Sequence, residues 1–139
     1  MSAWRSYRLW VIVTAIFFLI LSFLIVACGD KDSRAVDAAK WLTSYYKTDP
    51  SNMDWVLINI TVDGNGQLVV DVLVPDKGQI NLIKSRPRIE QVLIVSLTCP
   101  PKSAEIWTII GADQDLWVNL LEKTSGGLFK QITGSFCER

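Results

Sequence analysis

The chain contains no histidine among its 139 residues. Histidine is the commonest general base and the commonest metal ligand in proteins. Its absence excludes hydrolases that pair a serine or cysteine nucleophile with histidine, and it disfavours the usual zinc sites that mix cysteine with histidine. We therefore predict that the protein is not an enzyme and that it has neither a metal site nor another cofactor.

The chain also has no net charge, because its 14 basic side chains balance its 14 acidic ones. The nearest approach to a basic cluster is Lys84–Arg88, which we interpret as the solvated start of a helix. A protein that binds nucleic acid needs a basic surface that displaces counterions from the phosphate backbone. The composition therefore predicts no nucleic-acid partner.

One long apolar run is present, and it lies near the N-terminus. Leu9–Ala27 is nineteen residues without charge, and Arg5 and Arg8 precede it. A basic arm followed by an apolar run is typical of a secretory signal, and this run approaches the roughly 20 residues that cross a bilayer. We predict that residues 1–27 are a signal peptide or a transmembrane anchor. Because arginines favour the cytoplasmic side, the rest of the chain is expected outside the cytoplasmic membrane.

The end of this run, Leu24–Cys28, resembles the lipobox of bacterial lipoproteins. That motif places a leucine or branched residue three positions before a cysteine and a small residue directly before it, as Ile25 and Ala27 do here. The resemblance covers only the signal region. It implies cleavage before Cys28, a diacylglycerol thioether on its sulfur and often an acyl chain such as palmitate on its new amine. Two or three acyl chains anchor a protein stably. The alternative is an uncleaved single span that ends in an unmodified cysteine.

Two helices are predicted in the rest of the chain, which we divide into a tether at residues 28–33 and one domain at residues 34–139. Apolar side chains recur at three- and four-residue steps from Arg34 to Lys47, which indicates an amphipathic helix. A second set has the same spacing before Pro100 and predicts another helix: Ile89, Val92, Leu93, Ser96 and Leu97. A buried strand through Ile94–Leu97 is the alternative for this second segment.

Strand signals surround several predicted turns. Trp55–Val62 and Gln67–Val74 flank Asp63–Gly66, whose DGNG sequence is a strong hairpin signal. Glu105–Ile110 and Leu116–Leu121 are predicted to form a second pair, with one more strand from Leu128 to Ile132. Strands joined by hairpins form antiparallel sheets. We predict an α+β fold: the N-terminal membrane or signal helix, then a small two-layer domain whose antiparallel sheet carries two helices on one face.

Two cysteines remain after Cys28. An oxidising compartment allows Cys99 and Cys137 to pair, and closing a loop of this length stabilises a fold by about 4 kcal/mol in the chain-entropy model. Such a bond would also secure the C-terminus, which otherwise frays. We predict this disulfide; two separate thiols are the alternative.

Aromatic residues supply the candidates for an interaction site. The chain has 6 tryptophans, and Trp41 shares the first predicted helix of the domain with Tyr45 and Tyr46. Core packing is the default role of such rings. If they are exposed, these three would form a protein-binding patch or a platform for a sugar.

The favoured hypothesis is a membrane-anchored, lipid-modified protein that acts as a non-catalytic accessory or interaction subunit of an envelope or membrane complex. The expected partners are membrane lipid and an envelope protein. The expected location is the cell membrane, with the domain facing the periplasm or the cell exterior. Alternatives are a periplasmic module that binds a small ligand or the cell wall, a single-pass membrane protein, and, more weakly, an enzyme that uses carboxylates, serine or lysine. A flat apolar patch would favour a protein partner, and a pocket with converging polar groups would favour a ligand.

The intact mass of the protein extracted from membranes tests the anchor. We expect a mass lower by residues 1–27 and higher by the acyl groups on Cys28. An unmodified chain that retains its N-terminus and partitions into the membrane would instead support the uncleaved span.

Overall fold

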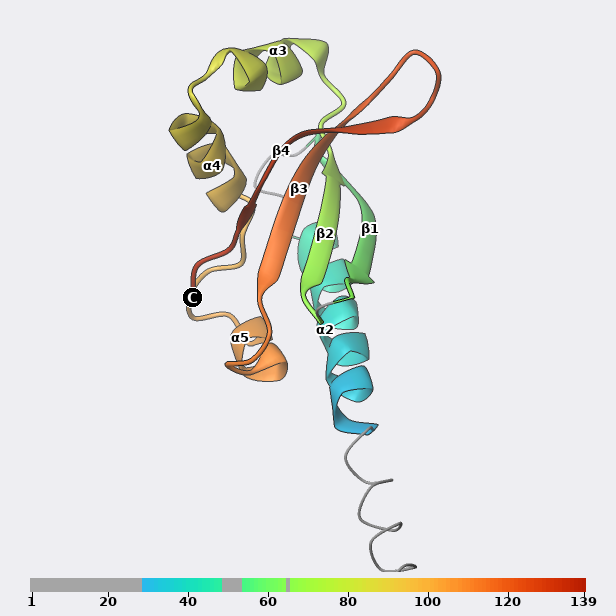
Figure 1. Ribbon diagram of the computed structural model, residues 1–139, viewed down its shortest axis with the longest axis vertical. Coiled ribbons are helices and arrows are strands. Elements are labelled where there is room, and N and C mark those ends of the chain that lie inside the picture. Colours follow the sequence, from blue (N-terminus) through green and yellow to red (C-terminus); the bar gives the residue numbers. More distant parts are fainter. Residues whose placement is uncertain (1–28, 49–53, 65) are drawn as a thin grey trace, which may run out of the picture. The chain divides into compact units, whose positions relative to one another are not determined.

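The structure is a computed structural model that describes residues 29–48, 54–64 and 66–139 (Figure 1). The apolar run at residues 9–27 and Cys28 lie outside the described residues. Within those ranges, none of the helices combines the length and hydropathy that a bilayer crossing requires. The chain divides into two units, Met1–Ser33 and Arg34–Arg139, and the second forms the folded domain.

The described residues form four helices and four strands. Their bounds are α2 (Gly29–Thr48), β1 (Val56–Val62), β2 (Leu68–Leu73), α3 (Lys77–Ser85), α4 (Arg88–Ser96), α5 (Ile106–Ile110), β3 (Leu116–Lys123) and β4 (Phe129–Phe136). The strands form one sheet in the order β1-β2-β3-β4. Neighbours pair antiparallel at both edges of the sheet, whereas β2 and β3 pair in parallel at its centre.

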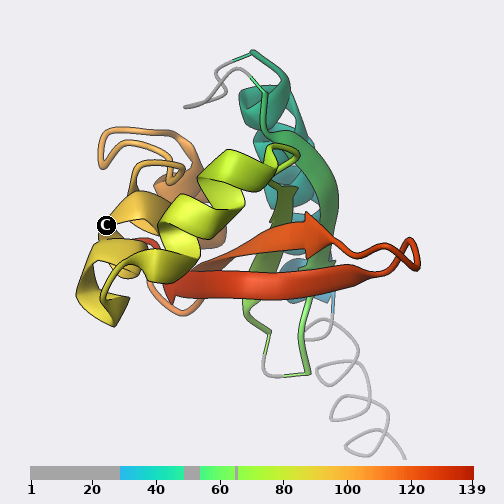
Figure 2. The ribbon, with the colours of Figure 1, turned by 90° about the horizontal axis from the view of Figure 1, so that it is seen from above.

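The core lies against one face of this sheet. Side chains alternate along the two central strands, and three buried cross-strand pairs stack in register: Leu68 with Leu116, Val70 with Val118, and Val72 with Leu120. Each described helix adds buried side chains to the same cluster. Seen from above, α3 and α4 lie beside β3 and β4, whereas α2 lies beside β1 and β2 (Figure 2). The fold class is therefore α+β, as predicted.

The β1–β2 hairpin is confirmed. Its turn is closed by two backbone hydrogen bonds, from Asp63 N to Gln67 O and from Gly66 N to Asp63 O. The Asp63 carboxylate also accepts a hydrogen bond from Gln67 N at 2.9 Å. Gly66 has φ +82°, a conformation that glycine adopts without the steric cost other residues incur. The turn chemistry visible in the sequence thus determines this part of the fold.

The second predicted hairpin is wrong, and so is the antiparallel sheet. Glu105–Ile110 was expected as a strand, but Ile106–Ile110 is the short helix α5. Ile106 and Ile110 are one helical turn apart and both are buried, so packing overrides the β-propensity of this β-branched segment. β3 consequently lacks a hairpin partner before it and pairs in parallel with β2. Parallel neighbours need a long crossover, which the segment containing α3, α4 and α5 provides.

Four described helices replace the predicted two. No helix was predicted directly after Gln67–Val74, but Asp76 caps α3 by accepting a hydrogen bond from Gln79 N at 2.7 Å, and Ile80 and Ile83 bury its inner face. Residues 29–33, expected as a tether, are helical and open α2, since polar residues do not prevent a helix. The last strand extends to Phe136, beyond the predicted Ile132. The second predicted helix is confirmed as α4, so the strand alternative is wrong.

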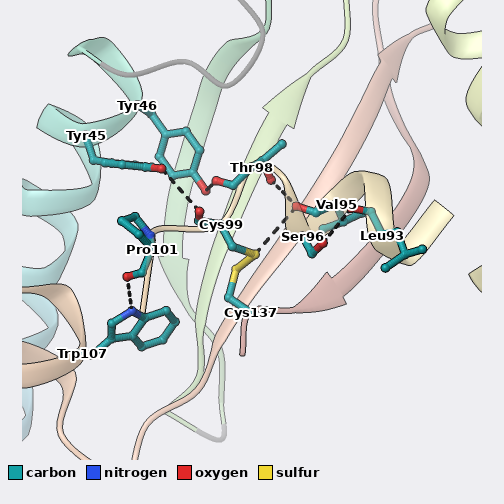
Figure 3. Close-up of a disulfide and its surroundings, with 10 residues drawn as sticks. All are labelled: Tyr45, Tyr46, Leu93, Val95, Ser96, Thr98, Cys99, Pro101, Trp107 and Cys137. Carbon is teal, nitrogen blue, oxygen red and sulfur yellow. Dashed lines mark hydrogen bonds between the residues drawn. A yellow bond between two sulfur atoms is a disulfide. The ribbon is translucent and has the colours of Figure 1, made fainter. Parts of the chain in front are cut away.

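The predicted disulfide between Cys99 and Cys137 is confirmed, with a Cα–Cα distance of 5.5 Å. It ties the loop after α4 to the end of β4 (Figure 3). Tyr46 Oη donates to the carbonyl oxygen of Thr98 at 2.9 Å, directly before the bonded cysteine. The same loop is thus held from two sides, by α2 and by β4.

Replacing both Cys99 and Cys137 with alanine should lower the free energy of unfolding by about 4 kcal/mol, because the open chain regains loop entropy. Urea unfolding of the variant and of the parent protein in the same detergent measures the difference. Equal stabilities would contradict a stabilising role for this bond.

Candidate functional site

Helix α4 and its C-cap residue expose three large apolar side chains. Val95 is fully buried on the inner face, whereas Ile89, Leu93 and Leu97 are exposed by 72%, 60% and 70%. These three side chains, which we call the α4 stripe, recur every four residues and therefore line one side of the helix. They belong to the pattern that predicted this helix in the sequence. The pattern indicates a helix correctly, but the face that it marks points toward solvent instead of toward the core.

Polar contacts at both ends hold α4 in this orientation. At its start, Arg88 donates to Thr133 Oγ1 and, at 2.8 Å, to the carbonyl oxygen of Gly134 on the edge strand β4. At its end, the carbonyl oxygen of buried Thr98 accepts a hydrogen bond from Tyr46 Oη of α2 at 2.9 Å. Rotating the helix to bury the stripe would break these bonds, so the exposed face is built into the fold.

A groove of about 380 Å³ adjoins the α4 stripe. One wall is formed by Val92, Leu93 and Ser96 of α4, and the other by Phe136 of β4, with Pro100 and Pro101 between them. Cys99 also borders the groove, so the disulfide holds its two walls together. Helix α4 thus presents an apolar ridge beside a preformed hollow.

Charged side chains flank the α4 stripe in the sequence and border its groove. Arg86 and Glu90 pair across one helical turn at 3.2 Å, Lys84 pairs with Glu122 at 2.6 Å, and Lys102 and Glu138 border the groove. Exposed ion pairs contribute little to stability. An apolar centre with a polar rim is nevertheless the usual anatomy of a protein interface.

The three candidate interaction aromatics have different surroundings. Tyr46 is buried, with 9% of its surface exposed, and belongs to the core. Trp41 and Tyr45 are half-buried and stack on each other, with ring centroids 5.2 Å apart. Tyr45 Oη also reaches the carbonyl oxygen of Cys99 at 3.4 Å (Figure 3). Tyr46 therefore offers no ring surface to a partner, and the other two offer only part of theirs.

The structure also locates the remaining sequence candidates. Cys28, the predicted lipid-bearing residue, lies outside the described residues. In the described part of the chain, no three histidine, cysteine, aspartate or glutamate side chains gather in a way that could hold a metal ion. Sequence reasoning missed the α4 stripe as a site, although its spacing was visible, because periodicity does not say which face is covered.

Comparison with known proteins adds no relative to these observations. The chain matches no protein-family model, no curated protein and no solved structure. Its function is therefore inferred from the chemistry and exposure of its own residues.

Tyr46 makes the fold sensitive to alkali. Its burial, and to a lesser degree the neighbouring Tyr45, raise the pKa of Tyr46 above the ordinary value of 10.0, while the side chain of Thr98 partly opposes this. The folded state therefore holds the phenol proton more tightly than the unfolded state. This stability is fully present below pH 10 and is lost as the pH rises through the folded pKa.

We expect Tyr46→Phe to lower the free energy of unfolding by about 1 kcal/mol at neutral pH, because the hydrogen bond to Thr98 is lost. Above pH 10 the parent protein should lose stability more steeply than the variant, by about 1.4 kcal/mol per pH unit. Urea midpoints measured from pH 8 to 11.5 test this. Parallel pH profiles for the two proteins would show that Tyr46 does not carry the effect.

Proposed function

We propose that the protein is a membrane-anchored, extracytoplasmic accessory subunit that binds an envelope protein through the α4 stripe. In this proposal Cys28 carries the lipid, residues 1–27 are removed, and the domain from Arg34 onward acts outside the cytoplasmic membrane without catalysis. The N-terminal arginines, the apolar run and the lipobox-like end support the anchor. The stripe supports the interaction.

The single observation that carries the interaction is the exposure of Ile89, Leu93 and Leu97 on one helix face. Each exposed apolar side chain is unremarkable alone, because folded proteins leave much apolar surface in water. Three on one face, beside a groove and inside a charged rim, form a contiguous patch of the kind that marks interaction sites. The periodic spacing fits a helix or an extended segment lying across α4.

The direction of the chain favours a protein partner over the anchoring bilayer. Because β2 and β3 are parallel, α3 after β2 and α5 before β3 lie at opposite ends of the sheet (Figure 1). Arg34, where the domain begins, pairs at 3.2 Å with Asp113 in the loop after α5. The anchored end of the chain therefore enters the domain at the α5 end of the sheet. Helix α4 instead directly follows α3, which lies at the opposite end.

The dimensions of the site suggest how a partner would engage it. From Ile89 to Leu97 a helix advances about 12 Å, at about 1.5 Å per residue. A partner helix could place two or three apolar side chains along that length, and a further side chain could enter the groove beside Phe136. Such buried apolar anchors dominate the affinity of most interfaces.

Site-specific photo-crosslinking in the cells that make the protein tests this proposal. A photoreactive residue in place of Leu93 should give one defined adduct with an envelope protein. The same residue in place of Leu128, which is 73% exposed in the β3–β4 loop, is the matched control and should give none. Ile89→Asp should reduce the adduct at position 93 by at least about tenfold, which corresponds to losing about 1.4 kcal/mol of binding energy.

Ile89→Asp is a clean probe because the position is exposed and lies in the first turn of α4, where an acidic side chain suits the helix dipole. Stability should therefore change by less than about 0.5 kcal/mol. Adducts at positions 93 and 128 with the same set of proteins, insensitive to Ile89→Asp, would reject the stripe as the interface. Adducts with lipid alone would show that the stripe contacts the bilayer.

A further inference from the structure

The face of the sheet opposite the core carries a polar row beside a mostly apolar one. Registered pairing aligns Asn59, Asp71, Asn119 and Gly134 across all four strands. In the same way Val69, Trp117 and Phe136 form a neighbouring row. Asp71 and Asn119 are 48 residues apart in the chain. Only the parallel β2–β3 pairing places their side chains together.

A hydrogen-bonded network orients the polar row. Trp117 Nε1 donates to Asn119 Oδ1 at 2.6 Å, and Gln131 Nε2 donates to the same oxygen at 2.9 Å. Asn119 Nδ2 in turn donates to Asp71 Oδ1 at 2.9 Å. Because an indole N–H can only donate, Trp117 determines which way the Asn119 amide faces. The network leaves Asp71 Oδ2 and Gln131 Oε1 as acceptors that receive no hydrogen bond from any described residue.

Gly134 provides the space for this network. An alanine Cβ at this position would lie 2.6 Å from Asn119 Oδ1 and 2.8 Å from both Gln131 Nε2 and Trp117 Nε1. Gly134 is not among the glycines with positive φ, so the requirement is for room and not for an unusual backbone conformation. Glycine weakens the interior of a strand and often marks a close approach. Here three polar side-chain atoms make that approach.

The network borders an open hollow of about 360 Å³. Trp117 and Phe136 form its aromatic wall, with ring centroids 4.6 Å apart and planes at 89°. Gln67, Asn119 and Gln131 add amides, and Asp63 adds a carboxylate, while no lysine or arginine lines it. An anionic ligand would therefore meet the Asp63 carboxylate and no opposite charge. The volume lies within the range of small-ligand sites.

We propose that this hollow binds a neutral saccharide. One face of a sugar ring carries C–H groups that pack on aromatic carbon, which Trp117 and Phe136 offer. The hydroxyl groups are hydrogen-bond donors. Gln131 Oε1 is an acceptor in the lining of the hollow, and Asp71 Oδ2 is a second acceptor on the neighbouring strand, next to the lining residue Asn119. The site lies on the outer face of the sheet and uses none of the three side chains of the α4 stripe, although Phe136 also borders the groove beside that stripe.

The test uses the full chain, ¹⁵N-labelled at tryptophan, in a detergent without a sugar headgroup. Binding to an array of neutral oligosaccharides is measured first. The strongest ligand is then titrated while the indole N–H signals are recorded, with Trp117→Phe identifying the signal of Trp117. We expect that signal to shift on binding. Asp71→Asn should weaken binding at least tenfold, because it replaces an acceptor with a donor and keeps the shape.

Two further variants separate binding from folding. Gly134→Ala should abolish binding and leave the protein folded, because it displaces side-chain atoms from a backbone that alanine can adopt. Asp54→Asn, at an exposed carboxylate before β1, is the matched control and should bind like the parent protein. The proposal is overturned if no neutral glycan binds, if Asp71→Asn and Asp54→Asn behave alike, or if choline, glucuronate or glucose 6-phosphate shifts Trp117 where neutral sugars do not. Ile89→Asp should leave glycan binding unchanged, so either site can fail without the other.

Discussion

The parallel pairing of β2 with β3 is the constraint on which the rest of the domain depends. It stacks three buried aliphatic pairs on the inner face of the sheet, and this stacking supplies the centre of the core. It also forces the chain to return from one end of the sheet to the other, because parallel neighbours cannot be joined by a tight turn. Helices α3, α4 and α5 are the result of that return. The position of α4 beside the edge of β4 is therefore a consequence of the sheet.

The crossover from β2 to β3 also explains why the disulfide between Cys99 and Cys137 stabilises the domain. The loop after α4 leaves the helix, passes the C-terminal end of β4 and continues to α5. Cys99 and Cys137 fasten the loop to the strand, and the buried Tyr46 hydroxyl fastens it to α2. Without these attachments the loop would be a long exposed connection with few apolar contacts, the kind of segment that opens locally. The groove beside α4 keeps its shape because both of its walls are attached at this point.

Two surfaces with different chemistry meet at β4. The α4 stripe and its groove are apolar with a charged rim, which suits a protein surface. The outer face of the sheet carries amides and a carboxylate beside two rings, which suits a polyhydroxylated ligand. Phe136 borders both hollows. An anchored protein that holds a saccharide on one side and a protein on the other would bring the two together at the membrane surface, where tethering raises their local concentration.

Local signals in the sequence predicted part of this architecture. The DGNG turn, the two amphipathic helices and the cysteine pair were visible because turn chemistry, helical periodicity and covalent pairing depend on residues close in sequence or on their number. α3 was missed because a proline and a glycine beside Asp76 resemble a turn, although Asp76 caps a helix. α5 was missed because Ile106–Ile110 is rich in β-branched residues that favour strands locally. The first error misread a local cap as a turn, and the second arose where burial of Ile106 and Ile110 outweighed local preference.

The sequence by itself determined the α+β class, the first hairpin, the disulfide partners and the lack of histidine chemistry, because these follow from residue type and short spacing. Only the tertiary structure decided which face of α4 is covered and that Asp71, Asn119 and Gly134 share one row. The physical reason is that both features depend on strand register and helix orientation, which are set by contacts between residues far apart in the chain. A lone aspartate or asparagine within an apolar strand was the only local sign of that row.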